Sequence, residues 1–170
     1  MLTLGLPIDP SEGFERAIQP KGLVFPGDII ISSTETAKKE AEKAYVTSTD
    51  LILWSDGSKL ETETIGAGIV WKNGHEWQQK LCPLGRTKEV FDAELYGIRD
   101  ALNIAIKGGN PLRRGTLLEY PYSRVIVFSD SQAALRRAQG DYLGPGQAIA
   151  IDIIAKAQEL TQKRVKVILK

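Results

Sequence analysis

Two short stretches of the chain have similar sequences, and this similarity constrains the fold more than any other feature. Residues 51–58 have the sequence Leu-Ile-Leu-Trp-Ser-Asp-Gly-Ser, and residues 125–132 have the sequence Val-Ile-Val-Phe-Ser-Asp-Ser-Gln. Four large apolar residues in a row are typical of a strand covered on both faces, as in parallel sheets. Because a predicted helix separates the two stretches, their strands can lie parallel. Asp56 and Asp130 then lie side by side at the carboxyl ends of neighbouring strands, where open α/β sheets bind their ligands.

The paired aspartates indicate a site for a divalent cation. Two carboxylates this close repel each other, and the pKa of one of them rises unless a cation lies between them. Magnesium takes oxygen ligands and often links protein carboxylates to substrate phosphates. We therefore expect Asp56 and Asp130 to bind Mg²⁺ or Mn²⁺. The alternative is that each aspartate only caps the turn or helix that follows its strand.

A third acidic residue falls on the core-facing side of a predicted helix. Between residues 89 and 107, apolar residues recur at spacings of four and three, which predicts an amphipathic helix. These residues are Phe91, Leu95, Ile98, Leu102 and Ala105. Glu94 lies on the same stripe, and a carboxylate that faces a core is costly unless something compensates its charge. A metal ion shared with the aspartate pair provides that compensation. The alternative is a glutamate at the edge of the stripe that reaches solvent.

Overall composition bounds the class of protein. The 170 residues suit one domain with an extension, and 42% hydrophobic residues are enough for a core. A net charge of +1 means that any surface for nucleic acid must be local. The single cysteine, Cys82, excludes an intrachain disulfide and fits a reducing compartment. The sequence has neither a long apolar run nor a secretory signal over residues 1–10, so we expect an intracellular protein, nuclear or cytoplasmic, that does not enter the membrane.

The chain divides into an arm and a folded body. Prolines and glycines interrupt residues 1–32, and the charged run over residues 34–44 predicts a short solvated linker helix, so residues 1–46 are interpreted as an irregular arm with a linker helix. The body is predicted over residues 47–170. Its expected elements are strands near 51–58, 65–72 and 76–81, a helix over 89–107, a strand over 125–129, helices over 131–139 and 147–163, and a strand over 165–169.

A basic connection precedes the second aspartate strand. Residues 108–122 contain a glycine pair, two prolines and the pair Arg113-Arg114. These arginines, with Lys107 and Arg124 beside them, are candidates for contacts with a phosphate backbone. A solvated surface loop explains the same residues equally well.

The order of elements, with three short motifs, resembles the ribonuclease H family. The motifs are Ser-Asp-Gly-Ser at 55–58, Asp-Ala-Glu-Leu at 92–95 and Phe-Ser-Asp-Ser-Gln at 128–132. The form most similar is the ribonuclease H domain of non-LTR retrotransposon reverse transcriptases, notably fungal ones. The resemblance implies an α/β fold in which a five-stranded mixed sheet, with three antiparallel strands and then two parallel ones, carries helices on both faces.

The resemblance also implies an activity, which is hydrolysis of the RNA strand of an RNA–DNA hybrid by two Mg²⁺ ions about 4 Å apart. By motif match, Asp56 bridges both ions, while Glu94 and Asp130 bind the ion on the leaving-group side. Gly57, Ser58 and Gln132 occupy the positions where the family contacts the RNA strand and its 2′-hydroxyl groups, which distinguish RNA from DNA.

The sequence departs from the family pattern at its end. The family carries a fourth carboxylate on a last helix and a histidine before it, and both follow the strand that here ends near Leu169. The only histidine, His75, lies in a predicted hairpin turn, and Asp152 lies on the flank of a late helix. We therefore expect a domain truncated after its fifth strand, with impaired cleavage. A non-catalytic relic that binds nucleic acid is the alternative, and an integrase-like or resolvase-like nuclease is a less fitting one.

Overall fold

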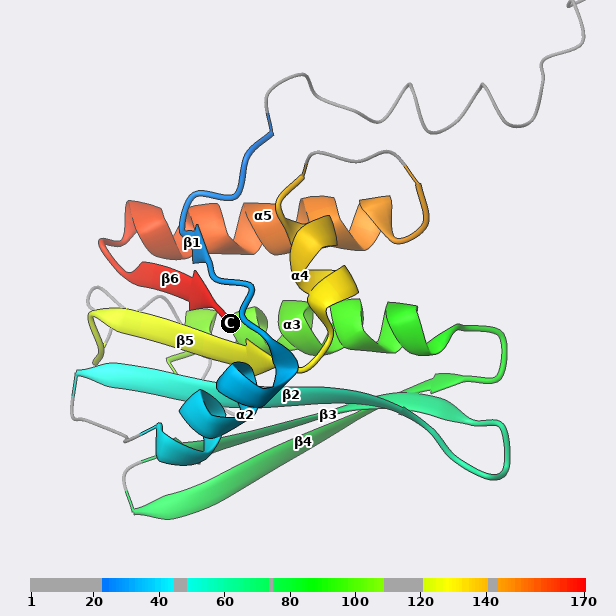
Figure 1. Cartoon of the computed structure of the whole chain (residues 1–170). Coiled ribbons are helices and arrows are strands. Elements are labelled where there is room, and N and C mark those ends of the chain that lie inside the picture. Colours follow the sequence, from blue (N-terminus) through cyan, green and yellow to red (C-terminus); the bar gives the residue numbers. More distant parts are fainter. Residues whose placement is uncertain (1–22, 45–48, 74, 109–120, 141–143) are drawn as a thin grey trace, which may run out of the picture.

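The computed structural model describes residues 23–44, 49–73, 75–108, 121–140 and 144–170, which form a sheet with helices on both faces (Figure 1). In chain order the elements are β1 (Asp28–Ile29), α2 (Thr34–Lys43), β2 (Asp50–Lys59), β3 (Ile65–Asn73), β4 (Glu76–Gly85), α3 (Val90–Ile106), β5 (Arg124–Ser129), α4 (Gln132–Ala138), α5 (Gln147–Gln162) and β6 (Lys166–Leu169).

The sheet is mixed, with the strand order β1-β6-β5-β2-β3-β4. Strands β2, β5 and β6 are parallel neighbours, whereas β3 is antiparallel to both β2 and β4. The ribonuclease H-like expectation of three antiparallel strands followed by two parallel ones is confirmed. Over the described residues the sheet has six strands and not five, because the two residues of β1 pair in parallel with β6. A two-residue edge strand is too short to leave a periodic signal in the sequence.

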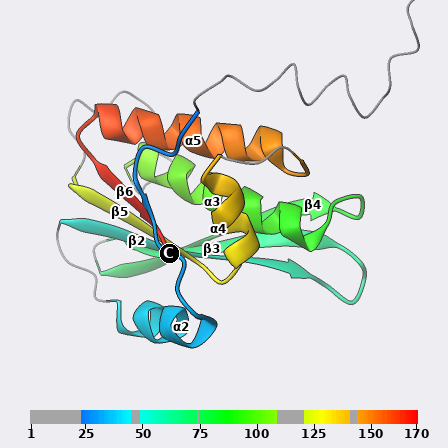
Figure 2. The same cartoon turned by 45° about the horizontal axis from the view of Figure 1, so that its top comes forward.

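The helices cover the two faces unequally, as Figures 1 and 2 show. Helices α3, α4 and α5 share one face, and their apolar residues form the larger core with alternate residues of the strands, including Leu53 and Val127. A smaller cluster on the other face contains Ile52, Ile126, Phe128 and Ile168. Ala41 of α2 and its C-cap residue Ala44 pack against this cluster. The aspartate strands are thus buried on both sides, as their continuous apolar runs predict.

The described part of the N-terminal arm lies against the sheet. Phe25 is 6% exposed and belongs to the larger core. Asp28 forms an ion pair with Lys166 at 2.9 Å, and the amide of Ile30 donates to the carbonyl of Leu169. These contacts position α2 beside the carboxyl ends of β5 and β6. Among the described residues, no helix combines the length and apolar character that a membrane span requires.

Candidate metal and nucleic-acid site

The register of β2 and β5 places two aspartates next to each other. Ser55 pairs with Ser129 at the end of the parallel ladder, so that Asp56 and Asp130 each stand one residue beyond a matched pair. Both serines are buried: Ser55 Oγ donates to the carbonyl of Phe128, and Ser129 Oγ accepts from an amide of the following turn. The small buried serines hold the strand ends together and leave both aspartates exposed at the edge.

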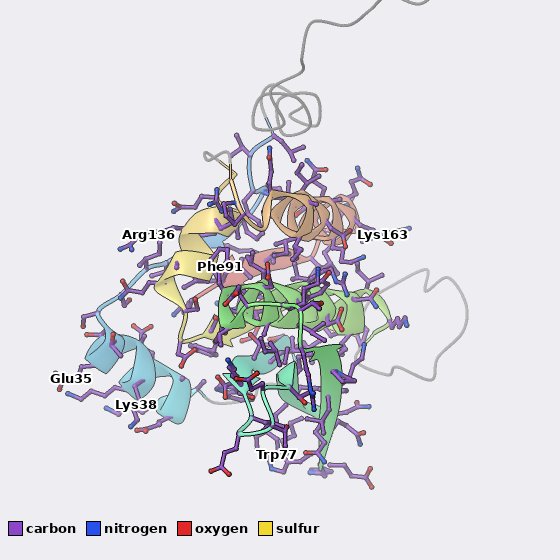
Figure 3. The ribbon with its side chains drawn as sticks, turned by 90° about the vertical axis from the view of Figure 1, so that its right-hand side faces the viewer. Glu35, Lys38, Trp77, Phe91, Arg136 and Lys163 are labelled. Atoms are coloured by element: carbon purple, nitrogen blue, oxygen red, sulfur yellow. The ribbon has the colours of Figure 1, made fainter. Side chains whose placement is uncertain are left out.

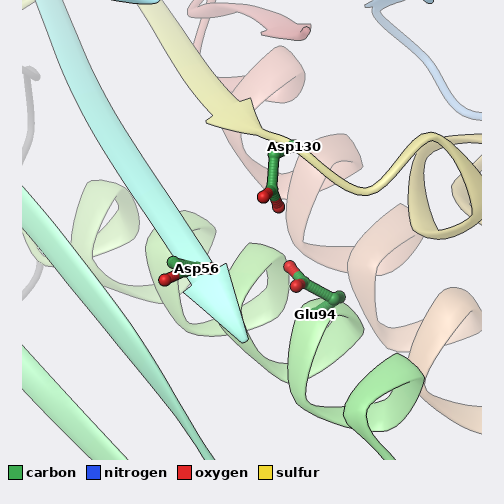
Figure 4. A group of neighbouring side chains, drawn as sticks. All are labelled: Asp56, Glu94 and Asp130. Carbon is green, nitrogen blue, oxygen red and sulfur yellow. The ribbon is translucent and has the colours of Figure 1, made fainter. Parts of the chain in front are cut away.

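Helix α3 delivers the third carboxylate. The helix begins at Val90 after a capping box in which Glu89 and Asp92 exchange backbone and side-chain hydrogen bonds. Glu94 follows one turn later and faces the two aspartates (Figure 4). The end of β2 passes so close to this turn that a Cβ at Gly57 would lie 2.7 Å from the backbone nitrogen of Glu94. Glycine at position 57 is therefore what allows the helix to approach the strand.

The three carboxylates form one group. One oxygen of each of Asp56, Glu94 and Asp130 lies within 4.8 Å of the others. Glu94 is only 7% exposed, and its Oε2 is a buried oxygen without a hydrogen-bond partner in the described part of the chain. The expected convergence of the three side chains is thus present, and it leaves one buried oxygen with unused bonding capacity.

Electrostatics at this group favour protonation in the absence of a cation. Burial raises the pKa of Glu94 to about 7, the charge of Asp130 adds to this effect, and a hydrogen bond from the backbone of Gly57 opposes it. Burial also raises the pKa of Asp56, again with a contribution from Asp130. Repulsion between like charges and partial desolvation both disfavour ionised carboxylates. A positive charge placed between the carboxylates offsets this unfavourable free energy of ionisation.

These residues fit a divalent cation. The atoms available to bind a metal ion are all carboxylate oxygens, which are the ligands that Mg²⁺, Mn²⁺ and Ca²⁺ prefer. The Oε2 atom of Glu94 is buried and has no hydrogen-bond partner among the described residues, so it is free to bind a cation, while Asp56 and Asp130 are exposed and leave room for water or substrate oxygens.

The residues that the sequence associates with RNA contacts lie around this group. Ser58 is exposed on β2, two residues beyond Asp56, whereas Gly57 packs against α3. Gln132 begins α4, and its side chain is already engaged: Nε2 donates to the carbonyl of Ser32 at 2.9 Å, and Oε1 accepts from Arg136. Gln132 therefore reaches a nucleic acid only by exchanging the bond with Ser32.

Other sequence candidates lie elsewhere. Arg113 and Arg114 fall outside the described residues. Asp152 on α5 is within 4.0 Å of both Arg99 and Lys156 and is not part of the carboxylate group. His75 lies in the turn after Asn73, far along β3 from Gly68, which is the partner of Asp56. Within the described ranges, the group therefore consists of three carboxylates.

The sequence did not reveal a cavity of about 430 Å³ that adjoins the carboxylates and lies between α2 and the sheet. Its lining includes Trp54, Phe128, Lys38 and Lys170 together with Asp56 and Asp130. The sequence signal for this cavity was the pair of alanines at positions 37 and 41. They lie one helical turn apart, and their small side chains leave space between the helix and the sheet.

No family model and no curated protein matches the chain. Among solved structures, it is similar to the N-terminal RNase H domain of a Mycobacterium tuberculosis protein fused to maltose-binding protein, with 17% identity and a TM-score of 0.49 over 71% of this chain and 85% of that one. It is also similar to a foamy viral protease–reverse transcriptase in complex with an RNA/DNA hybrid, with 14% identity and a TM-score of 0.48 over 75% of this chain and 18% of that one.

A third similar structure is an RNase H1 isolated from compost by a metagenomic approach, with 18% identity and a TM-score of 0.47 over 73% of this chain and 84% of that one. These identities and TM-scores are low, and we therefore define the fold of this chain from its own strand order and register.

Proposed function

We propose that the chain is a metal-dependent nuclease that hydrolyses the RNA strand of an RNA–DNA hybrid. The observation that carries the proposal is the carboxylate group itself. Asp56, Glu94 and Asp130 lie within 4.8 Å of one another, at the ends of two parallel strands and on the helix that crosses them. The three sequence motifs that contain these residues support the same activity, and the retrotransposon-like form of the motifs belongs to the proposal as well.

In this proposal each residue has a defined task. Asp56, the last carboxylate of β2, would contribute to both ions, while Glu94 and Asp130 would hold the ion on the leaving-group side. Bound divalent ions supply the positive charge that activates the attacking water and stabilises the leaving oxygen. Ser58, the backbone of Gly57 and, after release from Ser32, Gln132 contact the RNA strand. Arg113 and Arg114 are proposed to contact phosphates.

Binding without cleavage is the second candidate, and one observation favours it. The described residues contribute three carboxylates to the group, so an ion on the water side would be held mainly by Asp56. A single carboxylate holds Mg²⁺ weakly, because the ion gives up its waters reluctantly. On this view the protein recognises hybrid nucleic acid, and cleavage is slow.

One experiment separates the two candidates. A hybrid labelled on its RNA strand is incubated with the protein and Mg²⁺ or Mn²⁺, and cleavage and binding are measured in parallel. A nuclease cuts the RNA strand, loses activity in Asp56→Asn and Glu94→Gln, and keeps it in Asp152→Asn, which alters an acidic residue outside the group. Retained binding with no cutting by the wild-type protein supports the second candidate, and loss of both rejects the two together.

A further inference from the structure

The cavity beside the carboxylates lies between α2 and the face of the sheet that the other helices leave open. Its volume is about 430 Å³, in the range of pockets that bind small organic groups. Its walls combine apolar side chains with a few polar and charged ones. They include Ala37, Lys38, Trp54, Asp56, Phe128 and Asp130.

Helix α2 lies over the sheet without filling the space beneath it. None of its ten residues is buried, and Ala41 packs against the apolar cluster together with the C-cap residue Ala44. Three side chains of the body hold the segment: Trp54 Nε1 donates to Ala41 at 3.2 Å, Gln132 to Ser32 at 2.9 Å, and Lys170 to Glu40 at 3.5 Å. Two of the four α2 residues that line the hollow, Ala37 and Ala41, have side chains of a single methyl group, which leaves space above the sheet.

The floor of the cavity is aromatic and leads to the carboxylates. Trp54 and Phe128 are register partners on β2 and β5, and their rings are nearly parallel with centroids 6.0 Å apart. Asp56 and Asp130 follow these two residues by two positions and therefore project from the same face of the sheet. A group that occupies the cavity is consequently next to any ligand held by the two aspartates.

The rim of the cavity carries a cation that is available to a ligand. Lys38 lines the cavity, and none of the described residues forms an ion pair with it, whereas Lys170 is held by Glu40. Figure 3 shows Lys38 on α2 and Arg136 on α4 projecting from the same side of the molecule. An aromatic floor with a free ammonium group at the rim suits a planar apolar body that carries a negative charge.

We propose that this cavity binds one unpaired nucleotide of the strand held at the carboxylates, with its base against Trp54 and Phe128 and its phosphate near Lys38. The proposal rests on the proposed function, because the strand at the carboxylate group supplies the nucleotide. A base within a continuous duplex is stacked and paired, so it must leave the stack to enter the space beneath α2. The protein therefore prefers hybrids that end in, or join, a single-stranded segment beside the site.

The cavity has little means of selecting a particular base. The hydroxyl groups of Ser32 and Thr34 lie in its walls, and a hydroxyl donates or accepts according to its partner. Stacking on aromatic side chains tolerates every base, because each has a flat face. The expected selectivity is for the structure of the nucleic acid, a paired-to-unpaired junction, and not for its sequence.

The test compares two hybrids in the presence of Mg²⁺, one fully paired and one with an unpaired overhang that carries 2-aminopurine. The RNA strand is 2′-O-methylated, so that nothing is cut during the measurement. For the wild-type protein we expect quenching of the 2-aminopurine fluorescence and roughly tenfold tighter binding of the overhang hybrid, which is near the lower end of what stacking of one base provides.

Two pairs of variants localise the effect. Ala37→Leu places a larger side chain in the cavity and should abolish both the quenching and the preference, whereas Glu42→Leu places the same side chain on an exposed position of the same helix and should preserve them. Lys38→Ala should weaken binding of the overhang hybrid several-fold and reduce its salt dependence. Lys39→Ala, at a lysine that already pairs with Glu35, should do neither.

The outcomes keep this proposal separate from the proposed function. Equal affinity of the wild-type protein for both hybrids, or equal behaviour of Ala37→Leu and Glu42→Leu, overturns the cavity proposal. Cutting of a fully paired, unmethylated hybrid reports on nuclease activity alone, because that substrate offers no unpaired base. A protein that prefers the overhang but never cuts retains the cavity proposal and loses the nuclease.

Discussion

The backbone of Gly57 lies so close to Glu94 that a methyl group at position 57 would come within 2.7 Å of the Glu94 nitrogen and 2.9 Å of its Cδ. The same glycine donates a backbone hydrogen bond to the Glu94 carboxylate. The strand end and the first turns of α3 are thus fixed relative to one another at the point where the three carboxylates meet. A side chain at position 57 would therefore require the strand end or the turn of α3 that carries Glu94 to shift.

Replacing Gly57 with alanine should therefore weaken both the fold and metal binding. Overpacking at a tight contact costs about 1–3 kcal/mol, and we expect a lower midpoint of thermal unfolding together with a higher Mg²⁺ concentration for half-saturation. Gly68→Ala is the matched control, because Gly68 pairs with Asp56 in the sheet and its Cβ would meet only the Leu81 side chain, at 3.8 Å. Equal destabilisation by the two substitutions would contradict the close-approach argument.

The charge of Asp130 opposes ionisation of its two neighbours, Asp56 and Glu94. Asp130→Asn should leave the metal-free fold unchanged or stabilise it by up to about 1 kcal/mol, which is a rise of roughly 2–4 °C in Tm. It should also reduce the stabilisation that added MgCl₂ provides, and thermal unfolding with and without the salt measures both effects. A strongly destabilised metal-free variant would instead make Asp130 a structural cap. Asp152→Asn, outside the group, should not alter the response to magnesium.

The carboxylate group was predictable because local patterns determine it. Four apolar residues before each aspartate specify buried parallel strands, and the in-phase register follows from the matched Ser-Asp sequences that end them. The position of Glu94 follows from the helical period of Phe91, Leu95 and Ile98. Each of these inferences uses a signal carried within one element, and the structure only has to bring two strands and one helix together.

The contacts of the N-terminal segment were not predictable in the same way. The bond between Gln132 and the carbonyl of Ser32 joins residues 100 positions apart, and a two-residue strand such as β1 has no periodic signature. The cavity depends on where a polar helix with an alanine face settles, and the sequence of α2 alone predicts only a solvated helix. None of the residues of α2 is buried, so the helix has no apolar face in its sequence that could predict where it packs. Its position is set instead by tertiary contacts.

Cys82 should be an unreactive thiol. Burial raises its pKa to about 11, and a hydrogen bond to Asp100 at 2.9 Å together with the charge of that carboxylate adds to the effect, against Lys80 and Arg99. Roughly one thiol in a thousand is then ionised at pH 8, and only the thiolate reacts. Asp100→Asn should shift the pH profile of alkylation to lower pH and speed the reaction several-fold at pH 8, while burial keeps part of the shift in the pKa of the thiol. Asp152→Asn is the control, and an unshifted profile in Asp100→Asn would contradict the assignment.

Glu94 should make the stability of the metal-free protein depend on pH. Its pKa is about 7 in the folded state, mainly through burial and then through the charge of Asp130, against about 4.3 in an unfolded chain. Between these values the folded state binds more protons than the unfolded state, so the free energy of unfolding falls as pH rises from about 4.3 to about 7 and levels off above. At about 1.4 kcal/mol for each pKa unit, the total loss is at most about 3–4 kcal/mol.

Glu94→Gln tests this dependence, because glutamine keeps the size of the side chain and an oxygen that accepts from Gly57. In EDTA, urea unfolding at pH 5 and pH 8 should show that the variant lacks most of the loss seen in the wild-type protein, so that it is the more stable of the two at pH 8. Added Mg²⁺ should reverse this order, because the ion binds the ionised carboxylate and stabilises only the wild-type group. A wild-type protein that becomes more stable between pH 5 and pH 8 without metal, by an amount that Glu94→Gln removes, would give the linkage the opposite sign and exclude a raised pKa at Glu94.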